Sequence, residues 1–260
     1  SDLKILSSPI KRFLLQIIAI ILSVFILNLQ VASTRIIFLD YLLDNTVFNY
    51  FFVSFSILIL LNGTNFIDGL NGLVLGYYLI ILLILQQLQL NSEILDIKHI
   101  INYLIVLFSI LFLFNLFNQF FLGDGGAYIL ALIFSFFLIS LNNFDQNISP
   151  FFIVLLLWYP CFELLFSILR KIRFHKSPIL PDIKHLHQLI FYVVKKKLKA
   201  NKIFCNSLSS CLINFYNLII FSIALNDPYN SQLQIFLIFV NIFFYTFLYL
   251  RFFDFKFKAT

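Results

Sequence analysis

The amino-acid sequence predicts an all-α, polytopic integral membrane protein, and three observations support this fold class. The chain of 260 residues is 61% hydrophobic and only 12% charged, whereas soluble domains are usually about 45–50% apolar with about 25% charge. The apolar residues form long runs, many of them near the roughly 20 residues that a membrane-spanning helix needs. These runs are solid and lack the alternation of membrane β-strands, so helices are the expected spans.

Eight apolar runs are the expected spans. The second is short, and it either begins earlier, near Ile36, or lies tilted in the bilayer. In chain order, the expected spans are Phe13–Val31, Val47–Leu61, Leu73–Leu88, His99–Phe117, Ala127–Leu141, Phe151–Leu169, Ile203–Leu225 and Leu233–Leu250.

The positive charges predict the orientation of these spans. Of the 18 lysines and arginines, all but Arg35 and Lys98 fall in loops on one side of the membrane, and the positive-inside rule makes that side cytoplasmic. Membrane orientation therefore accounts for the formal charge of +6, and no nucleic-acid partner is expected. The cytoplasmic segments that carry polar motifs are 1–12, 62–72, 118–126 and 170–202.

The sequence predicts a single domain without a disulfide framework. No internal repeat is visible, so residues 1–260 are expected to form a single transmembrane domain. The sequence contains no methionine, which we interpret as a truncated N-terminus. Its three cysteines lack the spacing of a disulfide framework.

The most distinctive segment is Asn62–Leu73, which has three glycines, three asparagines and one aspartate between two apolar runs. Asp68 and Asn71 are three residues apart and would share a face of a helix, which Asn65 could join. A carboxylate at the membrane edge is costly unless it is paired or functional. A plain turn and helix cap is the alternative, but the density of polar residues and glycines favours a catalytic loop.

A second polar loop, Gly123–Gly126, precedes the fifth expected span. Asp124 could cap that helix, with the amides of Gly125 and Gly126 facing an anion. Alternatively, Asp124 binds a hard cation, since Mg²⁺ typically uses one or two protein carboxylates together with phosphate oxygens. The motif by itself leaves both interpretations open.

The third loop contains a His-x-His pair, His185 and His187, among basic residues that include Arg170 and Lys184. Two residues apart on an extended segment, the two imidazoles would point the same way. The composition favours phosphate binding over zinc, because no cysteine lies near. An ordinary basic loop is the alternative.

Glu163 lies within the sixth expected span, two helical turns or about 10 Å before Arg170. An acid buried in a span is by default functional. Two interpretations of Glu163 are weighted equally. It either lines the cytoplasmic cavity or is a structural acid paired to a basic residue.

In order along the chain, these loops resemble those of the polyprenyl-phosphate N-acetylhexosamine-1-phosphate transferase family, most closely its O-antigen-initiating branch. Asn62–Leu73 resembles the family's Asn-x-x-Asn-φ-x-Asp-Gly-φ-Asp-Gly-Leu loop, where φ is apolar, and Phe121–Gly126 resembles its Phe-φ-Gly-Asp-x-Gly loop. Ser177–Leu189 resembles its His-x-His-His loop. Ser1 and Asp2 resemble an Asp-Asp motif whose first aspartate is lost or replaced.

The sequence also departs from the family pattern. Asn71 stands where the family usually has a second aspartate, and Gln188 stands where it has a third histidine. The family has ten or eleven spans, so the resemblance implies that two or three precede Ser1.

The resemblance implies an Mg²⁺-dependent phosphoglycosyl transferase, with Mn²⁺ as an alternative ion. Such an enzyme transfers N-acetylhexosamine-1-phosphate from a UDP-sugar to undecaprenyl phosphate and releases UMP. It would act at the cytoplasmic face of the bacterial inner membrane, where it starts a lipid-linked glycan such as O-antigen or teichoic acid. Its partners would be both substrates and the lipid bilayer; a homodimer is left open.

The resemblance also implies residue roles. Asp2, Asp68 and Asp124 would be catalytic, and Asp2 and Asp124 would hold the metal. The implied substrate-binding residues are Asn62, Asn65, Asn71, Asn115, Arg170, Lys184, His185 and His187. We expect acidic and imidazole side chains from these loops to converge around a magnesium-bound diphosphate. A membrane transporter and a catalytically degenerate member of the same family are the alternatives.

Overall fold

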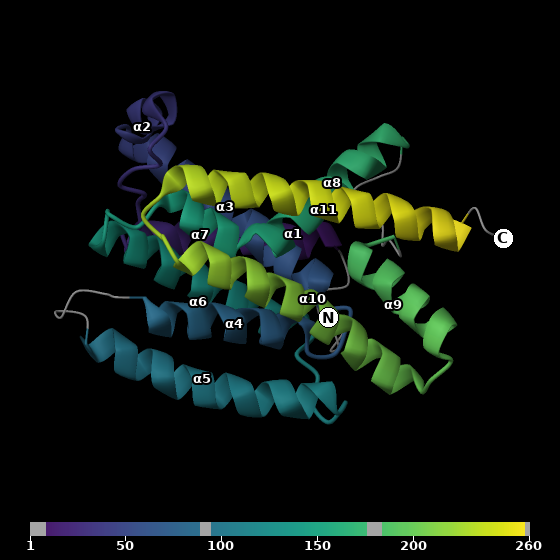
Figure 1. Ribbon diagram of the computed structural model, residues 1–260. Coiled ribbons are helices and arrows are strands. Elements are labelled where there is room, and N and C mark those ends of the chain that lie inside the picture. Colours follow the sequence, from purple (N-terminus) through teal and green to yellow (C-terminus); the bar gives the residue numbers. More distant parts are fainter. Residues whose placement is uncertain (1–8, 89–94, 176–183, 258–260) are drawn as a thin grey trace. The chain divides into compact units, whose positions relative to one another are not determined.

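The computed structural model describes residues 9–88, 95–175 and 184–257, and within them the chain is all α-helical, without strands (Figure 1). The predicted fold class is therefore confirmed. The helices are α1 (Pro9–Ile26), α2 (Ile37–Leu43), α3 (Thr46–Ile67), α4 (Leu73–Gln87), α5 (Leu95–Leu116), α6 (Gly123–Phe144), α7 (Pro150–Leu156), α8 (Trp158–Arg173), α9 (Leu186–Leu198), α10 (Lys202–Leu225) and α11 (Ser231–Phe257).

Each of the eight apolar runs forms mostly helix, but the number of membrane spans is lower than expected. In the described ranges, five helices (α3, α5, α6, α10 and α11) are long and apolar enough to cross a membrane, and the bent pair α7–α8 makes six. The predicted spans that correspond to α1 and α4 are not among them. The 15 residues of α4 reach about 22 Å, less than the roughly 30 Å of a hydrocarbon core.

The sixth expected span is broken rather than continuous. Helices α7 and α8 meet at Leu157 with a bend of 71°. The physical cause is Pro160, which has no backbone N–H and whose ring crowds the carbonyl four residues earlier, at Leu156. That residue is where α7 ends.

Contacts divide the chain into two compact units, Ser1–Phe66 with Asp124–Pro181, and Ile67–Gly123 with Asp182–Thr260. The expected single catalytic domain stays a prediction. In the first unit, α1, α3 and α6 enclose a core that includes Val24, Ile57 and Ala131. Gly63 lets α3 approach α8 closely, because a Cβ at this glycine would lie 2.2 Å from the Pro160 carbonyl oxygen.

The second unit is organised around α4, which packs against α5 and α10, while α9 packs against α10 and α11 (Figure 1). Most side chains of α4 are buried, which explains why this helix is apolar on all its faces. Gly76 permits the close approach of α10, because a Cβ there would lie 2.2 Å from Asn214 Nδ2.

In the first unit, the loop between α1 and α2 lies beside the loop between α6 and α7. Arg35 Nη2 donates to the carbonyl oxygens of Gln146 and Asn147, at 3.1 and 2.6 Å. Asp40 of α2 accepts hydrogen bonds from Ser33 Oγ at 2.8 Å and from Thr34 N at 2.6 Å. Burial alone would raise the pKa of Asp40, but the hydrogen bonds from Thr34, Ser33 and the Arg35 backbone outweigh it and lower that pKa.

Candidate active site

In the first unit, the candidate site is built around Asp124, in the first turn of α6. Asn65 Nδ2, from the last turn of α3, donates to Asp124 Oδ1 at 3.0 Å. Arg12 Nη1, from the start of α1, donates to Asp124 Oδ2 at 3.1 Å. The structure thus brings two of the predicted loops together and adds Arg12, which the sequence analysis did not single out.

The surroundings of Asp124 leave room for a ligand. Its side chain is 39% exposed, and that of Arg12 is 30% exposed. A Cβ built on Gly125 would meet nothing within 4 Å, so the backbone beside Asp124 faces open space. Because α6 begins at Gly123, Asp124 lies inside the first turn rather than at the predicted cap before it, where the helix dipole still favours a carboxylate.

Other predicted residues of the first unit make local contacts. Asn62 Nδ2 donates to the Leu58 carbonyl oxygen one turn earlier in α3, at 2.9 Å. Arg170 Nη2 donates to Ser167 Oγ in α8 at 3.3 Å. Glu163 is almost fully buried in α8 at 1% exposure, and Lys171 Nζ lies 6.0 Å from the ring centroid of Phe66.

In the second unit, the backbone of the loop after α3 is held by side chains. Asn71 N donates to Asn206 Oδ1 at 2.6 Å, and Ser210 Oγ donates to the Asn71 carbonyl oxygen at 2.5 Å. Asn214 Nδ2 donates to the carbonyl oxygen of Gly72 at 2.9 Å. Gly72 has a φ of +80°, a conformation that glycine adopts without steric cost.

Asn115 connects this loop to the next. Its Oδ1 accepts a hydrogen bond from Gly72 N, and its Nδ2 donates to the Phe120 carbonyl oxygen at 2.6 Å. Asn71 Nδ2 donates to Asn118 Oδ1 at 2.9 Å. In this structure Asn71 and Asn115, two of the four predicted substrate-binding asparagines, therefore contact protein groups that shape the loop.

The sequence analysis missed the contribution of α10, although a signal was present. Asn206, Ser210 and Asn214 follow one another at intervals of four in a predicted membrane span. That spacing places the three polar side chains on one face of a helix, and this face holds the Asn71–Gly72 backbone.

The two histidines stack at the start of α9. His185 is the N-cap residue with an extended backbone, and its N donates to Gln188 Oε1 at 3.4 Å. The imidazole centroids lie 5.6 Å apart with 13° between the planes. The segment is not extended throughout, because His187 already lies in the first turn of α9. His187 is fully buried, and a Cβ on Gly69 would lie 2.6 Å from its Nε2. The second unit therefore brings His187 beside the residue that follows Asp68.

Lys184 has a different environment from the one expected. Its Nζ lies 5.3 Å from the ring centroid of Phe253 and 5.1 Å from that of Phe257, both near the end of α11. Asp2 and Ser177 lie outside the described residues. The convergence of Asp68, Asp124 and His185 stays a prediction.

Metal-ligating side chains are sparse. Within the described ranges, no group of three or more His, Cys, Asp or Glu residues could hold a metal ion. The assignment of Mg²⁺ to Asp124 therefore stays a prediction.

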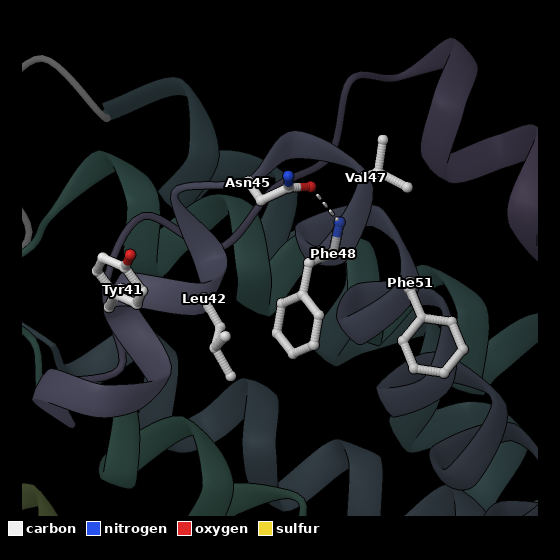
Figure 2. Close-up of a pocket in the computed structure, with 6 residues that line it drawn as sticks. All are labelled: Tyr41, Leu42, Asn45, Val47, Phe48 and Phe51. Carbon is white, nitrogen blue, oxygen red and sulfur yellow. Dashed lines mark hydrogen bonds between the residues drawn. The ribbon is translucent and has the colours of Figure 1, made fainter.

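An open hollow of about 690 Å³ lies between α2 and the start of α3 (Figure 2). Its lining is mostly apolar and contains none of the predicted site residues; it consists of Tyr41, Leu42, Asn45, Val47, Phe48 and Phe51. Within this lining, Asn45 Oδ1 accepts a hydrogen bond from Phe48 N at 3.0 Å. The hollow is therefore distinct from the candidate site.

The fold and loops define a polytopic helical membrane protein whose polar motifs follow the order of those of one transferase family. Residues 2–142 match the sequence profile of glycosyl transferase family 4, and the chain belongs to that family. This membership confirms the resemblance drawn from the motifs. The matched region includes Asp2, Asp68 and Asp124.

The chain is also similar to a curated protein of Bacillus subtilis (strain 168) described as "Probable undecaprenyl-phosphate N-acetylglucosaminyl 1-phosphate transferase". The two are 32% identical over 133 residues, which cover 48% of this chain and 36% of the relative. The chain thus matches about a third of that relative's length. No solved structure matches the chain.

Proposed function

We propose that this chain transfers N-acetylhexosamine-1-phosphate from a UDP-sugar to undecaprenyl phosphate and releases UMP. The observation that carries the proposal is the family match over the region that holds Asp2, Asp68 and Asp124, together with the Bacillus subtilis relative. The reaction would occur at the cytoplasmic face of the bacterial inner membrane and would start a lipid-linked glycan such as O-antigen or teichoic acid.

The proposed reaction is one phosphoryl substitution. An oxygen of the lipid phosphate attacks the phosphorus bonded to the sugar and forms a new P–O bond. The bond from that phosphorus to the bridging oxygen breaks, and UMP leaves with the electron pair. Because the lipid phosphate is already anionic at neutral pH, the reaction needs charge neutralisation and alignment more than a strong base.

The first unit supplies groups suited to charge neutralisation. Asp124, with Asp2, would hold Mg²⁺ or alternatively Mn²⁺, and the open space beside Gly125 is compatible with an occupant there. The ion would supply positive charge to the diphosphate oxygens. Arg12, already within 3.1 Å of Asp124, is a further cation suited to phosphate oxygens, while Asn65 orients the carboxylate.

The second unit supplies groups suited to binding and orientation. Asp68 would act in nucleotide binding or catalysis, and His185 and His187 would donate hydrogen bonds to phosphate or sugar. Asn71 and Asn115 would act by fixing the loop that presents Asp68, since both already bond to loop groups. The family match favours this transferase over the transporter alternative.

The test uses membranes that contain the full-length parent protein. With undecaprenyl phosphate and either UDP-N-acetylglucosamine or UDP-N-acetylgalactosamine, we expect release of UMP and formation of a lipid-linked sugar phosphate. A chelator should stop the reaction, and added Mg²⁺ should restore it. Absence of UMP with every UDP-sugar tried would reject the proposal and favour the catalytically degenerate alternative.

The Asp124→Asn variant tests the metal assignment. Removal of the carboxylate charge should abolish UMP release and reduce Mn²⁺ binding by the purified protein, measured by electron paramagnetic resonance, while membrane insertion is retained. Asp44→Asn is the matched control, because Asp44 is an exposed aspartate at the end of α2 and should leave both readouts unchanged. Unaltered turnover in Asp124→Asn would remove Asp124 from the site.

A further inference from the structure

Helix α11 is longer than a membrane crossing requires. Its 27 residues span about 40 Å at 1.5 Å per residue, compared with about 30 Å for the hydrocarbon core. Arg251, Asp254 and Lys256 place charge in its last two turns. Because such charges are unfavourable in hydrocarbon, we expect this end of α11 to lie outside the bilayer core.

This end of α11 contacts the residue that precedes the histidine pair. Phe253 and Phe257 lie one helical turn apart, and their ring centroids are 4.7 Å apart with the planes tilted by 43°. The ring of Phe253 also stacks on Tyr249, with the centroids 5.8 Å apart. Lys184 Nζ lies 5.3 and 5.1 Å from the centroids of Phe253 and Phe257. These are cation–π distances, within about 6 Å of the ring centre.

Similar contacts hold the other end of α9. Lys196 Nζ lies 4.7 Å from the ring centroid of Phe255 in α11. Lys256 of α11 lies 5.3 Å from the ring centroid of Tyr192 in α9. Helix α9 is thus bound to α11 near its beginning and along its basic last turns.

We propose that Phe253, Phe255 and Phe257, here termed the aromatic clamp, are positioning residues for His185 and His187. The proposal rests on the proposed function in that these histidines contact substrate. Lys184 directly precedes His185, the N-cap of α9, so the clamp fixes the backbone from which the first imidazole projects. The second imidazole is confined by Gly69, and the stacking of the two rings couples them.

This arrangement assigns Lys184 a role other than phosphate binding. Its ammonium group lies against the rings of Phe253 and Phe257. Lys184 therefore affects the substrate through the position of the adjacent histidines. Arginine can make the same contact with an aromatic face, whereas methionine has a similar length but no charge. Tyrosine retains the ring face of phenylalanine, whereas leucine retains only apolar bulk.

The experiment measures histidine accessibility and kinetics in the full-length protein. We compare the double variant Phe253→Leu/Phe257→Leu with Phe253→Tyr/Phe257→Tyr, and use Phe243→Leu/Phe247→Leu as a control at exposed positions of the same helix. The rate of diethyl pyrocarbonate modification of His185 and His187, measured by mass spectrometry, should rise about 5- to 30-fold in the first variant, as two cation–π contacts predict. It should stay unchanged in the other two.

A second pair of variants keeps the test independent of whether the leucine variant folds. Lys184→Met should raise histidine modification and the KM for the UDP-sugar by similar factors, while Lys184→Arg should retain wild-type values. Unchanged histidine modification in Lys184→Met and in the leucine variant would overturn the clamp. Increased modification in these variants, together with no transferase activity in the wild type, would support the clamp and reject the proposed function.

Discussion

The close approach of Gly69 to His187 gives a quantitative prediction for Gly69→Ala. The new Cβ would lie 2.6 Å from His187 Nε2 and 3.2 Å from Cδ2, whereas unstrained heavy atoms of this kind sit about 3.5–4.0 Å apart. The imidazole must therefore shift by about 1 Å. His187 is fully buried, so it has little space into which to move.

The shift should affect activity more than folding. Overpacking of this kind costs typically about 1–3 kcal/mol of stability, and a misplacement of about 1 Å can lower a rate by about 10²-fold. We therefore expect a large loss of kcat/KM in the UMP-release assay, with a modest fall in the thermal unfolding temperature of the detergent-solubilised protein.

A double-mutant cycle with His187→Ala isolates the contact. Once the imidazole is absent, the Cβ at position 69 meets no ring, so Gly69→Ala should cause no further loss of stability or activity in the His187→Ala background. Two outcomes would refute the reasoning. In one, the losses of stability and activity from the two single substitutions simply add in the double variant; in the other, Gly69→Ala is as active as wild type.

Two further predictions concern the first unit. Gly63→Ala should lower the thermal unfolding temperature strongly, because its Cβ would lie 2.2 Å from the backbone oxygen of Pro160, which cannot rotate away. Gly125→Ala is the stability control, since its Cβ meets nothing within 4 Å. Equal unfolding temperatures for the two variants would contradict the prediction. The pKa of Asp40 is lowered from 3.8 in the folded protein, so its carboxylate stabilises the fold above that pH and loses this effect as the pH falls through the folded-state pKa. The difference in unfolding temperature between wild type and Asp40→Asn should therefore be present at pH 6, decline as the pH falls below 3.8 and vanish below the folded-state pKa. A difference independent of pH would argue against this role.

Hydropathy predicted the helices well, because burial in lipid or in a helix bundle demands the same long apolar runs. It failed where one residue or one packing environment decides the outcome. A window average does not register Pro160, which ends α7 at Leu156. Nor does it distinguish α4, apolar because protein surrounds it, from a helix that is apolar because lipid does.

The candidate site shows a similar limit. The motif spacing placed Asp124 and Asn65 in loops that do meet, because both residues lie at helix ends whose positions the spans determine. Arg12 and Lys184 were harder to interpret, since a cation in a basic loop looks suited to phosphate whatever it contacts. The partner of each, a carboxylate for Arg12 and two rings for Lys184, is distant in sequence and depends on helix packing.

The departure at Asn71 is compatible with an intact loop. The backbone on both sides of this residue is held by Asn206, Ser210 and Asn214, and none of these bonds uses the Asn71 side chain. An asparagine here donates to Asn118 Oδ1, whereas an aspartate could only accept. Asparagine in place of the family's usual aspartate therefore removes one negative charge from the loop but keeps the contacts that shape it. This favours a folded site with altered charge over a site that has lost its structure.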